Sequence, residues 1–245
     1  HNIRAIETGL SSDPAMNWMI SGLDDITLIS NSDAHSPEKI GREANVFDCG
    51  LSYYEVKDII YKKDLKRFLY TIEFFPEEGK YHNDGHRECG INMHPKEAEK
   101  TGGICPVCGK TLTPGVLHRV KELADRPWNT RPKKAVPYKS LIQLEEIISD
   151  VKEAAPSSKK VKKEYEKMLS KGGTEFEILL DRTREELLKI GDAGIADAIT
   201  RMREGNVKLV PGYDGEFGKI SIFREIENAQ KASANMQLDL FGKGG

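Results

Sequence analysis

Several things are scarce in this sequence of 245 residues. No apolar run approaches the roughly 20 residues that a membrane-spanning helix needs, and no charged-then-apolar leader resembles a signal peptide. Charge of one sign is also lacking, because 37 basic residues stand against 39 acidic ones and the formal net charge is -2. These absences argue against membrane and secreted proteins and predict a cytoplasmic one. They give no global basic field for a nucleic acid, although local clusters of basic residues matter more.

Cysteine is sparse as well, with four residues in the whole chain: Cys49, Cys89, Cys105 and Cys108. In a reducing compartment, clustered cysteines indicate a metal site rather than disulfides. Cys49 stands alone and is expected in a core. The chain begins with His1 and not with Met. We therefore expect it to be the C-terminal part of a longer protein.

Residues 1–78 alternate strand-like and helix-like segments, which is typical of α/β architecture. Apolar runs predict strands at Ile3–Glu7, Ile26–Ser30 and Phe68–Phe75. Amphipathic or capped segments predict helices at Pro14–Leu23 and Tyr53–Lys63. This part is the first of four that the composition distinguishes.

Residues 79–125 concentrate histidine, cysteine and glycine, and residues 126–232 form a mainly helical region that opens with a linker at 126–135. Helices are expected at Ser140–Ala155, Lys160–Ser170, Arg184–Ile190 and Ile195–Arg203, followed by a β-hairpin within Val207–Phe223. Residues 233–245 form a tail rich in small residues, which we expect to be flexible.

The strongest chemical pattern is a pair of ligand pairs: His86-x2-Cys89, then fifteen residues, then Cys105-x2-Cys108. Two pairs of soft ligands on tight turns can close a tetrahedron around Zn2+, and four protein ligands leave no place for water. The pattern therefore predicts a structural zinc site. The alternative is reduced cysteines without metal, and His82 and His94 are alternatives to His86 as the fourth ligand.

A second metal pattern follows the apolar run that ends at Ser30. Asp33 and His35 are two residues apart, so their side chains point the same way if the strand geometry continues. A carboxylate and an imidazole at the C-terminal end of a strand are a sensible ligand pair for a barrel enzyme. A capping aspartate with a surface histidine is the alternative.

The Asn31–Ser36 segment resembles the last metal-binding motif of the PHP phosphoesterase superfamily. More specific runs resemble endonuclease Q, and they lie in order along nearly the whole chain: Ile6–Pro14, Ser32–Glu43, Tyr81–Arg87, Gly115–Val120 and Pro211–Gly215. The sequence has no G-x-x-x-x-G-K-[ST] motif, which argues against an ATPase.

The resemblance implies the C-terminal part of a PHP-type β/α barrel, followed by a small zinc-binding module and a mainly helical C-terminal domain. It also implies a metal-dependent nuclease that cleaves DNA 5′ to deaminated bases (uracil, hypoxanthine, xanthine) and abasic sites. Asp33 and His35 match family ligands of a cluster of Zn2+ or Mn2+ ions. Glu7 is a third candidate for the catalytic site, and it could equally cap a turn. The family's N-terminal His-x-His ligands are not in this sequence, so these residues alone are expected to be inactive.

Basic residues in the helical region are candidates for contacts with DNA phosphates: Lys160, Lys163, Arg201 and Arg203. Gly191–Gly194 loosely resembles the turn of a helix-hairpin-helix, but its spacing is Gly-x-x-Gly and Asp192 would repel an anion. A plain helical hairpin, and a solvated basic helix face, are the alternatives.

The tail contains Gln237, Leu238, Leu240 and Phe241, which resemble the pentapeptide that binds the bacterial sliding clamp and the first half of the archaeal PCNA-binding box. Spaced apolar anchors on a flexible segment suit docking into a groove. A last strand or helix packed on the body is the alternative.

Three function classes follow. The first is a DNA-repair endonuclease whose partners are damaged DNA and a sliding clamp. The second is a non-catalytic module that binds DNA and the clamp. The third is a phosphatase for small phosphate esters, which would need neither the zinc module nor the tail.

Overall fold

The computed structural model describes residues 3–128 and 130–223. Strands β1 (Ala5–Glu7) and β2 (Thr27–Ile29) pair in parallel, with Ala5 opposite Thr27. A second sheet has the order β3-β4-β7, where β3 spans Ala44–Phe47, β4 spans Phe68–Glu73 and β7 spans Tyr138–Ser140. Strand β4 is antiparallel to β3 and parallel to β7. The expected strands at the positions of β1, β2 and β4 are confirmed.

Two helices accompany these strands, α1 (Pro14–Asn17) and α2 (Tyr53–Lys62). The Asp13 carboxylate caps α1 by accepting a hydrogen bond from the Met16 N–H. The helix expected over Pro14–Leu23 is shorter than predicted, because the Trp18 carbonyl accepts a hydrogen bond from Arg126 instead of continuing the helix. A separate 3-10 turn covers Ser21–Leu23.

The fold class is mixed α/β, as expected. The strands of the described residues form separate sheets of two and three strands, and the barrel stays a prediction. Within the same residues, no helix is long and apolar enough to cross a membrane.

The cysteine-bearing segment forms a small unit of short elements: β5 (Asp84–His86), β6 (Ile91–Met93), α3 (Pro95–Lys100) and α4 (Val116–Leu123). Strands β5 and β6 form an antiparallel pair. The apolar core of this unit is small, with Ala98, Cys105 and Leu112 as its buried members. So small a core needs a further source of stability.

The helical region contains α5 (Leu144–Lys152), α6 (Lys159–Gly172), α7 (Arg184–Ile190) and α8 (Ala193–Arg203), with a π-helical turn at Glu177–Asp181. Their apolar faces share one core with the end of β4, including Ile72 and Phe75. The helix expected from Ser140 begins later, because residues 138–140 pair with β4. Glycines end two helices as expected, Gly173 after α6 and Gly191 after α7.

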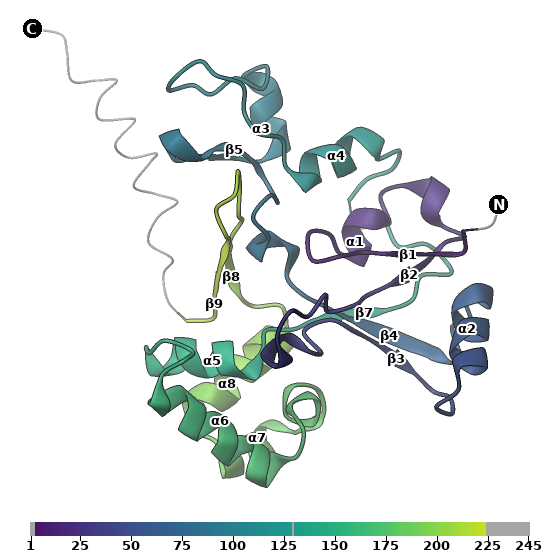
Figure 1. The fold of residues 1–245 in the computed structure, drawn as a ribbon, viewed down its shortest axis with the longest axis vertical. Helices are drawn as coiled ribbons and strands as arrows, with labels where there is room; N and C mark the ends of the chain where they lie inside the picture. Colours follow the sequence, from purple (N-terminus) through teal and green to yellow (C-terminus); the bar gives the residue numbers. More distant parts are fainter. Residues whose placement is uncertain (1–2, 129, 224–245) are drawn as a thin grey trace, which may run out of the picture.

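The predicted closing hairpin is confirmed as β8 (Lys208–Val210) and β9 (Lys219–Ser221). In Figure 1 it extends from the helices α5–α8 toward the unit that carries β5 and α3. Its tip packs closely, because a Cβ on Gly212 would lie 2.2 Å from the Gly79 carbonyl oxygen. A Cβ on Gly218 would lie 2.0 Å from the Glu77 carbonyl oxygen. Only glycine allows this approach of two backbones.

The side chain of Glu73 is completely buried and joins the end of β4 to the end of β1. Its carboxyl group accepts hydrogen bonds from the hydroxyls of Thr8, at the end of β1, and of Thr71. Burial raises the pKa of Glu73 to about 8, although these two hydrogen bonds oppose the shift. The negative charge of Glu43 adds to the increase.

The raised pKa makes the stability depend on pH. The folded state holds the Glu73 proton up to about pH 8, whereas an unfolded chain loses it near pH 4.3. Stability from this group is therefore present below about pH 4 and is lost as the pH rises toward 8. Between pH 5 and pH 8, we predict that the unfolding free energy of the wild type falls by about 3 kcal/mol more than that of Glu73→Gln. Urea unfolding at several pH values measures this difference. The control is Glu166→Gln at an exposed position, and equal pH dependence in all three proteins would contradict the prediction.

Candidate functional site

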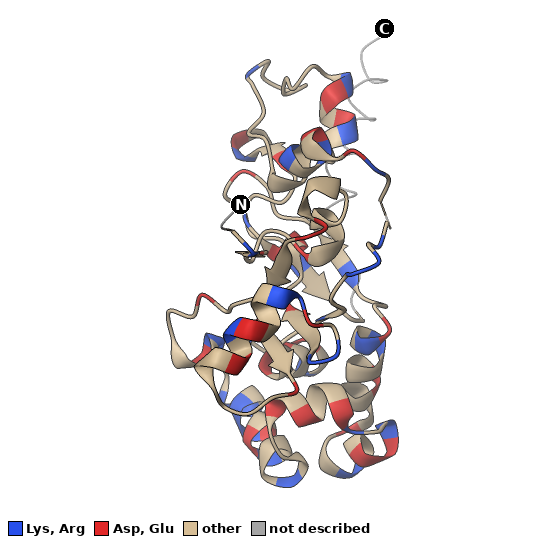
Figure 2. Cartoon of the chain, turned by 90° about the vertical axis from the view of Figure 1, so that its right-hand side faces the viewer, with Lys and Arg blue, Asp and Glu red and all other residues tan. Residues whose placement is uncertain are grey.

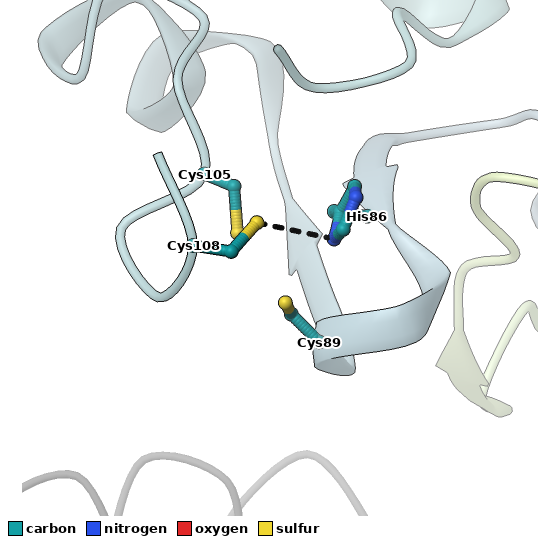
Figure 3. Close-up of side chains that lie close together, drawn as sticks. All are labelled: His86, Cys89, Cys105 and Cys108. Carbon is teal, nitrogen blue, oxygen red and sulfur yellow. Dashed lines mark hydrogen bonds between the residues drawn. The ribbon is translucent and has the colours of Figure 1, made fainter. Parts of the chain in front are cut away.

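The four residues predicted to bind zinc come together in space. One ligand atom from each of His86, Cys89, Cys105 and Cys108 lies within 4.8 Å of the others. The Cys108 sulfur is 3.8 Å from His86 Nδ1. Figure 3 shows the two cysteines of the Cys105–Cys108 loop facing His86 and Cys89 across a small gap.

Two tight turns position these ligands. His86 ends β5, and Cys89 lies in a 3-10 turn that ends at Gly90 with φ +65°. On the other side, the Cys105 N–H donates to the Lys110 carbonyl over 2.8 Å, and the Gly109 N–H donates back to the Cys105 carbonyl over 2.9 Å. Gly109 has φ +73°, which lets the loop turn back beneath its cysteines.

The arrangement fits a metal ion. Zinc–sulfur bonds of about 2.3 Å and zinc–nitrogen bonds of about 2.0 Å place tetrahedral ligands about 3.6 Å apart. Three thiols and one imidazole are the donors that zinc prefers in structural sites. The cluster can therefore hold a metal ion, and zinc remains the proposal for its identity.

The structure also distinguishes His86 from the other two candidate histidines. His82 is buried away from the cluster, and burial lowers its pKa to about 4. His94 caps α3 by accepting a hydrogen bond from the Lys96 N–H. Neither belongs to the ligand group.

Sequence reasoning missed a polar contact in the same unit. The carboxylate of Asp84 is buried, and its Oδ2 lies 2.6 Å from His118 Nδ1 on α4. Its Oδ1 accepts a hydrogen bond from the Gly115 N–H over 2.7 Å. Asp84 therefore holds α4 against the strand that supplies His86. Both residues stand in segments that carry the family resemblance, which was the available signal.

Asp33 and His35 lie on the loop that follows β2. Asp33 Oδ1 is 3.6 Å from His35 Nε2, and their side chains are 71% and 89% exposed. The pair therefore faces outward, with both polar ends close enough to contact one ion. A carboxylate and an imidazole fit Zn2+ or Mn2+ as two of its ligands.

Glu7 lies at the end of β1, opposite Ile29 of β2, and is exposed. Among the described residues, it does not complete a group of three metal ligands with Asp33 and His35. The nearby Glu43 is buried and has one carboxyl oxygen without a hydrogen-bond partner. Burial raises the pKa of Glu43 to about 7, and the charge of Glu7 contributes to the rise.

The candidate DNA-contacting residues differ in how free they are. Lys160 and Lys163 are exposed on α6, although Lys160 also donates to the Lys152 carbonyl. Arg201 lies over the Phe223 ring at 5.0 Å. Arg203 donates three hydrogen bonds to the carbonyls of Ile178, Leu179 and Arg182. Its guanidinium therefore caps carbonyls at and after the π-helical turn, so fewer of its N–H donors remain for DNA. Figure 2 shows acidic and basic residues side by side on these helices.

The turn between α7 and α8 favours the plain helical hairpin. The Asp192 carboxylate accepts a hydrogen bond from the Ile195 N–H over 3.0 Å, so a negative charge already occupies the N-terminus of α8. Lys152 contacts the same carboxylate. A DNA phosphate at this turn would meet that charge. The clamp-binding candidates Gln237, Leu238, Leu240 and Phe241 lie outside the described residues.

Comparisons with known proteins give one family model and several relatives. The model of the MJ0043 C-terminal domain matches residues 143–206. The chain is 36% identical over 221 residues to the uncharacterized protein MJ0043 of Methanocaldococcus jannaschii, covering 88% of this chain and 28% of that protein. It is 30% identical over 220 residues to the uncharacterized protein YqxK of Bacillus subtilis, covering 89% of this chain and 52% of YqxK.

Two solved structures are similar. One is the lesion-specific endonuclease PfuEndoQ from Pyrococcus furiosus, with a TM-score of 0.82 and 32% identity, covering 94% of this chain and 59% of that one. The other is endonuclease Q in complex with a 27-mer duplex substrate that has an abasic lesion at the active site. Its TM-score is 0.76 with 30% identity, covering 93% of this chain and 59% of that one. The chain thus spans less than two thirds of each of these relatives.

The group formed by His86, Cys89, Cys105 and Cys108 predicts a defined zinc content. We expect one zinc ion per purified chain, and its loss in Cys105→Ser because that position is buried within the ligand group. The small unit around it should then unfold locally, since a structural zinc contributes directly to folding. Plasma mass spectrometry gives the zinc content, and proteolysis between residues 79 and 125 reports the unfolding. Cys49→Ser is the control, and equal zinc content in both variants would contradict the assignment.

Proposed function

Because this chain belongs to the endonuclease Q family, we propose that it is part of a DNA-repair endonuclease. The enzyme cleaves the phosphodiester bond 5′ to deaminated bases (uracil, hypoxanthine, xanthine) and to abasic sites. The main support is the exposed Asp33–His35 pair at the end of β2, in a chain similar to a lesion-specific endonuclease. Metal ligands at strand ends, facing outward, are placed where a DNA backbone can reach them.

Asp33 and His35 would hold part of a cluster of Zn2+ or Mn2+ ions. Bound there, such ions would supply a nucleophilic water of lowered pKa and would stabilise the charge on the leaving oxygen. The contribution of this chain is to present both ligand atoms on one side of the loop, 3.6 Å apart. Two ligands do not hold a cluster, so we propose that further ligands lie outside the 245 residues and that these residues alone are inactive.

The remaining parts of the chain would bind the substrate. Exposed Lys160, Lys163 and Arg201 are proposed to contact phosphates, which fixes the DNA without selecting a sequence. Recognition of a deaminated base requires its extrusion from the stack, which costs less for a mispaired base. The zinc unit is proposed to be structural. The tail residues Gln237, Leu238, Leu240 and Phe241 are proposed to dock into a bacterial or archaeal sliding clamp.

The second candidate is a non-catalytic module that binds DNA and the clamp. The exposed basic residues of α6 favour it if the chain acts by itself. The two candidates differ in one measurable property, which is whether the full-length gene product cuts damaged DNA.

We predict that the full-length gene product, supplied with Mn2+ or Zn2+, nicks a duplex on the 5′ side of a single uracil. Asp33→Ala should lower the nicking rate by more than about 100-fold, because loss of a metal ligand costs more than changes in its surroundings do. Denaturing gel electrophoresis of an end-labelled strand gives the rate and the position of the cut.

Asp48→Ala is the control for this experiment, since Asp48 is also an exposed aspartate near β3. It should nick at the wild-type rate. Binding of the duplex without any cut by the wild type would overturn the nuclease proposal and support the non-catalytic module.

The phosphate contacts predict a change in salt dependence. Replacing Lys160 and Lys163 together by Ala should weaken binding of an undamaged duplex. It should also reduce the slope of log K against log salt by roughly 1 to 2, since each phosphate contact contributes about 0.9. Fluorescence anisotropy at several salt concentrations measures the slope. Replacing Lys57 and Lys66, which are exposed elsewhere, should leave it unchanged; equal slopes for both double variants would refute the assignment.

A further inference from the structure

The loop after β2, which carries Asp33 and His35, has an unusual backbone conformation at its centre. Asp33 has φ +45°, in the left-handed region that residues with a side chain rarely adopt. A conformation of this kind costs free energy and persists only where the surroundings impose it. The side chains of Asp33 and His35 are exposed, so their own packing does not impose it.

The first anchor of the loop lies at the end of β2. Asn45 of β3 accepts a hydrogen bond from the Ser30 N–H over 3.0 Å and donates one to the Ser30 carbonyl over 2.6 Å. The Ser30 hydroxyl donates to the Ile72 carbonyl of β4 over 2.8 Å. These bonds fix where the chain leaves the strand, three residues before Asp33, and leave the conformation of Asp33 itself undetermined.

The second anchor is Arg42. Its Nε donates to the Ser32 carbonyl over 2.8 Å, and its Nη2 lies 3.4 Å from the Asp33 carbonyl oxygen. These two carbonyls belong to the peptide groups on either side of the Asp33 Cα. Because φ and ψ of a residue describe how its two peptide groups are oriented, one guanidinium that bonds to both fixes the Asp33 conformation.

Arg42 is itself held in place. Its guanidinium lies over the ring of Phe74, 5.9 Å from the centroid. The neighbouring residue, Glu43, is buried and accepts a hydrogen bond from the Phe74 N–H. Phe74, which follows β4, therefore holds Arg42 in place, and Arg42 in turn holds the loop with Asp33. A lysine could offer its charge at this place, but its ammonium lacks the planar arrangement of donors that two carbonyls require.

We infer that Arg42 is a positioning residue, which holds the loop so that Asp33 and His35 present their ligand atoms to the same metal ion. The inference rests on the proposed function for its reaction, but its direct consequence is on metal binding. Residues that orient metal ligands typically change metal affinity or activity by about 10- to 100-fold when they are replaced.

The test uses the full-length gene product and Mn2+ as the probe. Electron paramagnetic resonance measures free Mn2+ during a titration and gives a dissociation constant, and Asp33→Ala identifies the part of the binding that belongs to this site. For Arg42→Met we expect Mn2+ binding at this site to weaken by about 10- to 100-fold. Arg42→Lys should fall between this variant and the wild type. Arg67→Met is the control, because Arg67 also bonds an acceptor, Asp64, on the turn before β4.

Nicking rates at increasing Mn2+ separate positioning from a direct role in the reaction. For Arg42→Met we expect the half-saturating Mn2+ concentration to rise and the rate at saturation to recover to within a few-fold of the wild type. Thermal unfolding of each variant shows whether it folds; should Arg42→Met fail to fold, the same titration of Arg42→Lys decides.

Unchanged Mn2+ binding in the Arg42 variants would overturn the inference. A rate loss that excess Mn2+ does not restore would also overturn it, since Arg42 would then act on the DNA. If the wild type binds Mn2+ through Asp33 and Arg42 but cuts no DNA, the proposed function fails while the positioning role stands.

Discussion

The buried carboxyl group of Glu73 links the C-terminal ends of β1 and β4. It accepts hydrogen bonds from Thr8, just past β1, and from Thr71 within β4. The Thr8 N–H in turn donates to the Ile29 carbonyl of β2 over 3.0 Å. The loop with Asp33 begins beside these bonds, at the end of β2. Phe74, whose ring lies under the guanidinium of Arg42, follows directly after Glu73. The place where the Asp33 loop begins therefore depends on this buried carboxyl group, and burial raises its pKa above that of an exposed glutamate.

The second constraint is the contact between the C-terminal hairpin and the cysteine-bearing unit. The Gly212 N–H donates to the Glu77 carbonyl over 2.7 Å, and the Asn83 N–H donates to the Gly212 carbonyl over 2.9 Å. Asp214 accepts hydrogen bonds from the Arg87 N–H and the Thr113 hydroxyl. Residues more than 100 positions apart thus position β5, which supplies His86. These hydrogen bonds to the hairpin stabilise the unit from outside its small core, and a metal ion held by the four ligand residues would stabilise it further.

The sequence allowed accurate predictions where the signal is local. The clustering of His86, Cys89, Cys105 and Cys108 was predictable because each pair lies on one turn, and their role as metal ligands stays a prediction. The bounds of α7 were predictable because Thr183 and Glu186 form a capping box. The features that escaped prediction depend on contacts between distant residues. Strand β7 has only three residues and exists because β4 offers it an edge. Glu73 and Thr8 are 65 positions apart, and the three hydrogen bonds of Arg203 reach back to the carbonyls of residues 178, 179 and 182.

We propose that the chain carries two separate metal sites with different tasks: a closed cysteine–histidine site and an open site at Asp33 and His35. Anomalous diffraction at the zinc and manganese absorption edges, from crystals of the full-length gene product grown with Mn2+, distinguishes the two. We expect a zinc peak among His86, Cys89, Cys105 and Cys108, and a manganese peak in contact with both Asp33 and His35. A zinc peak alone, with Asp33 and His35 contacting no metal, would refute the second site.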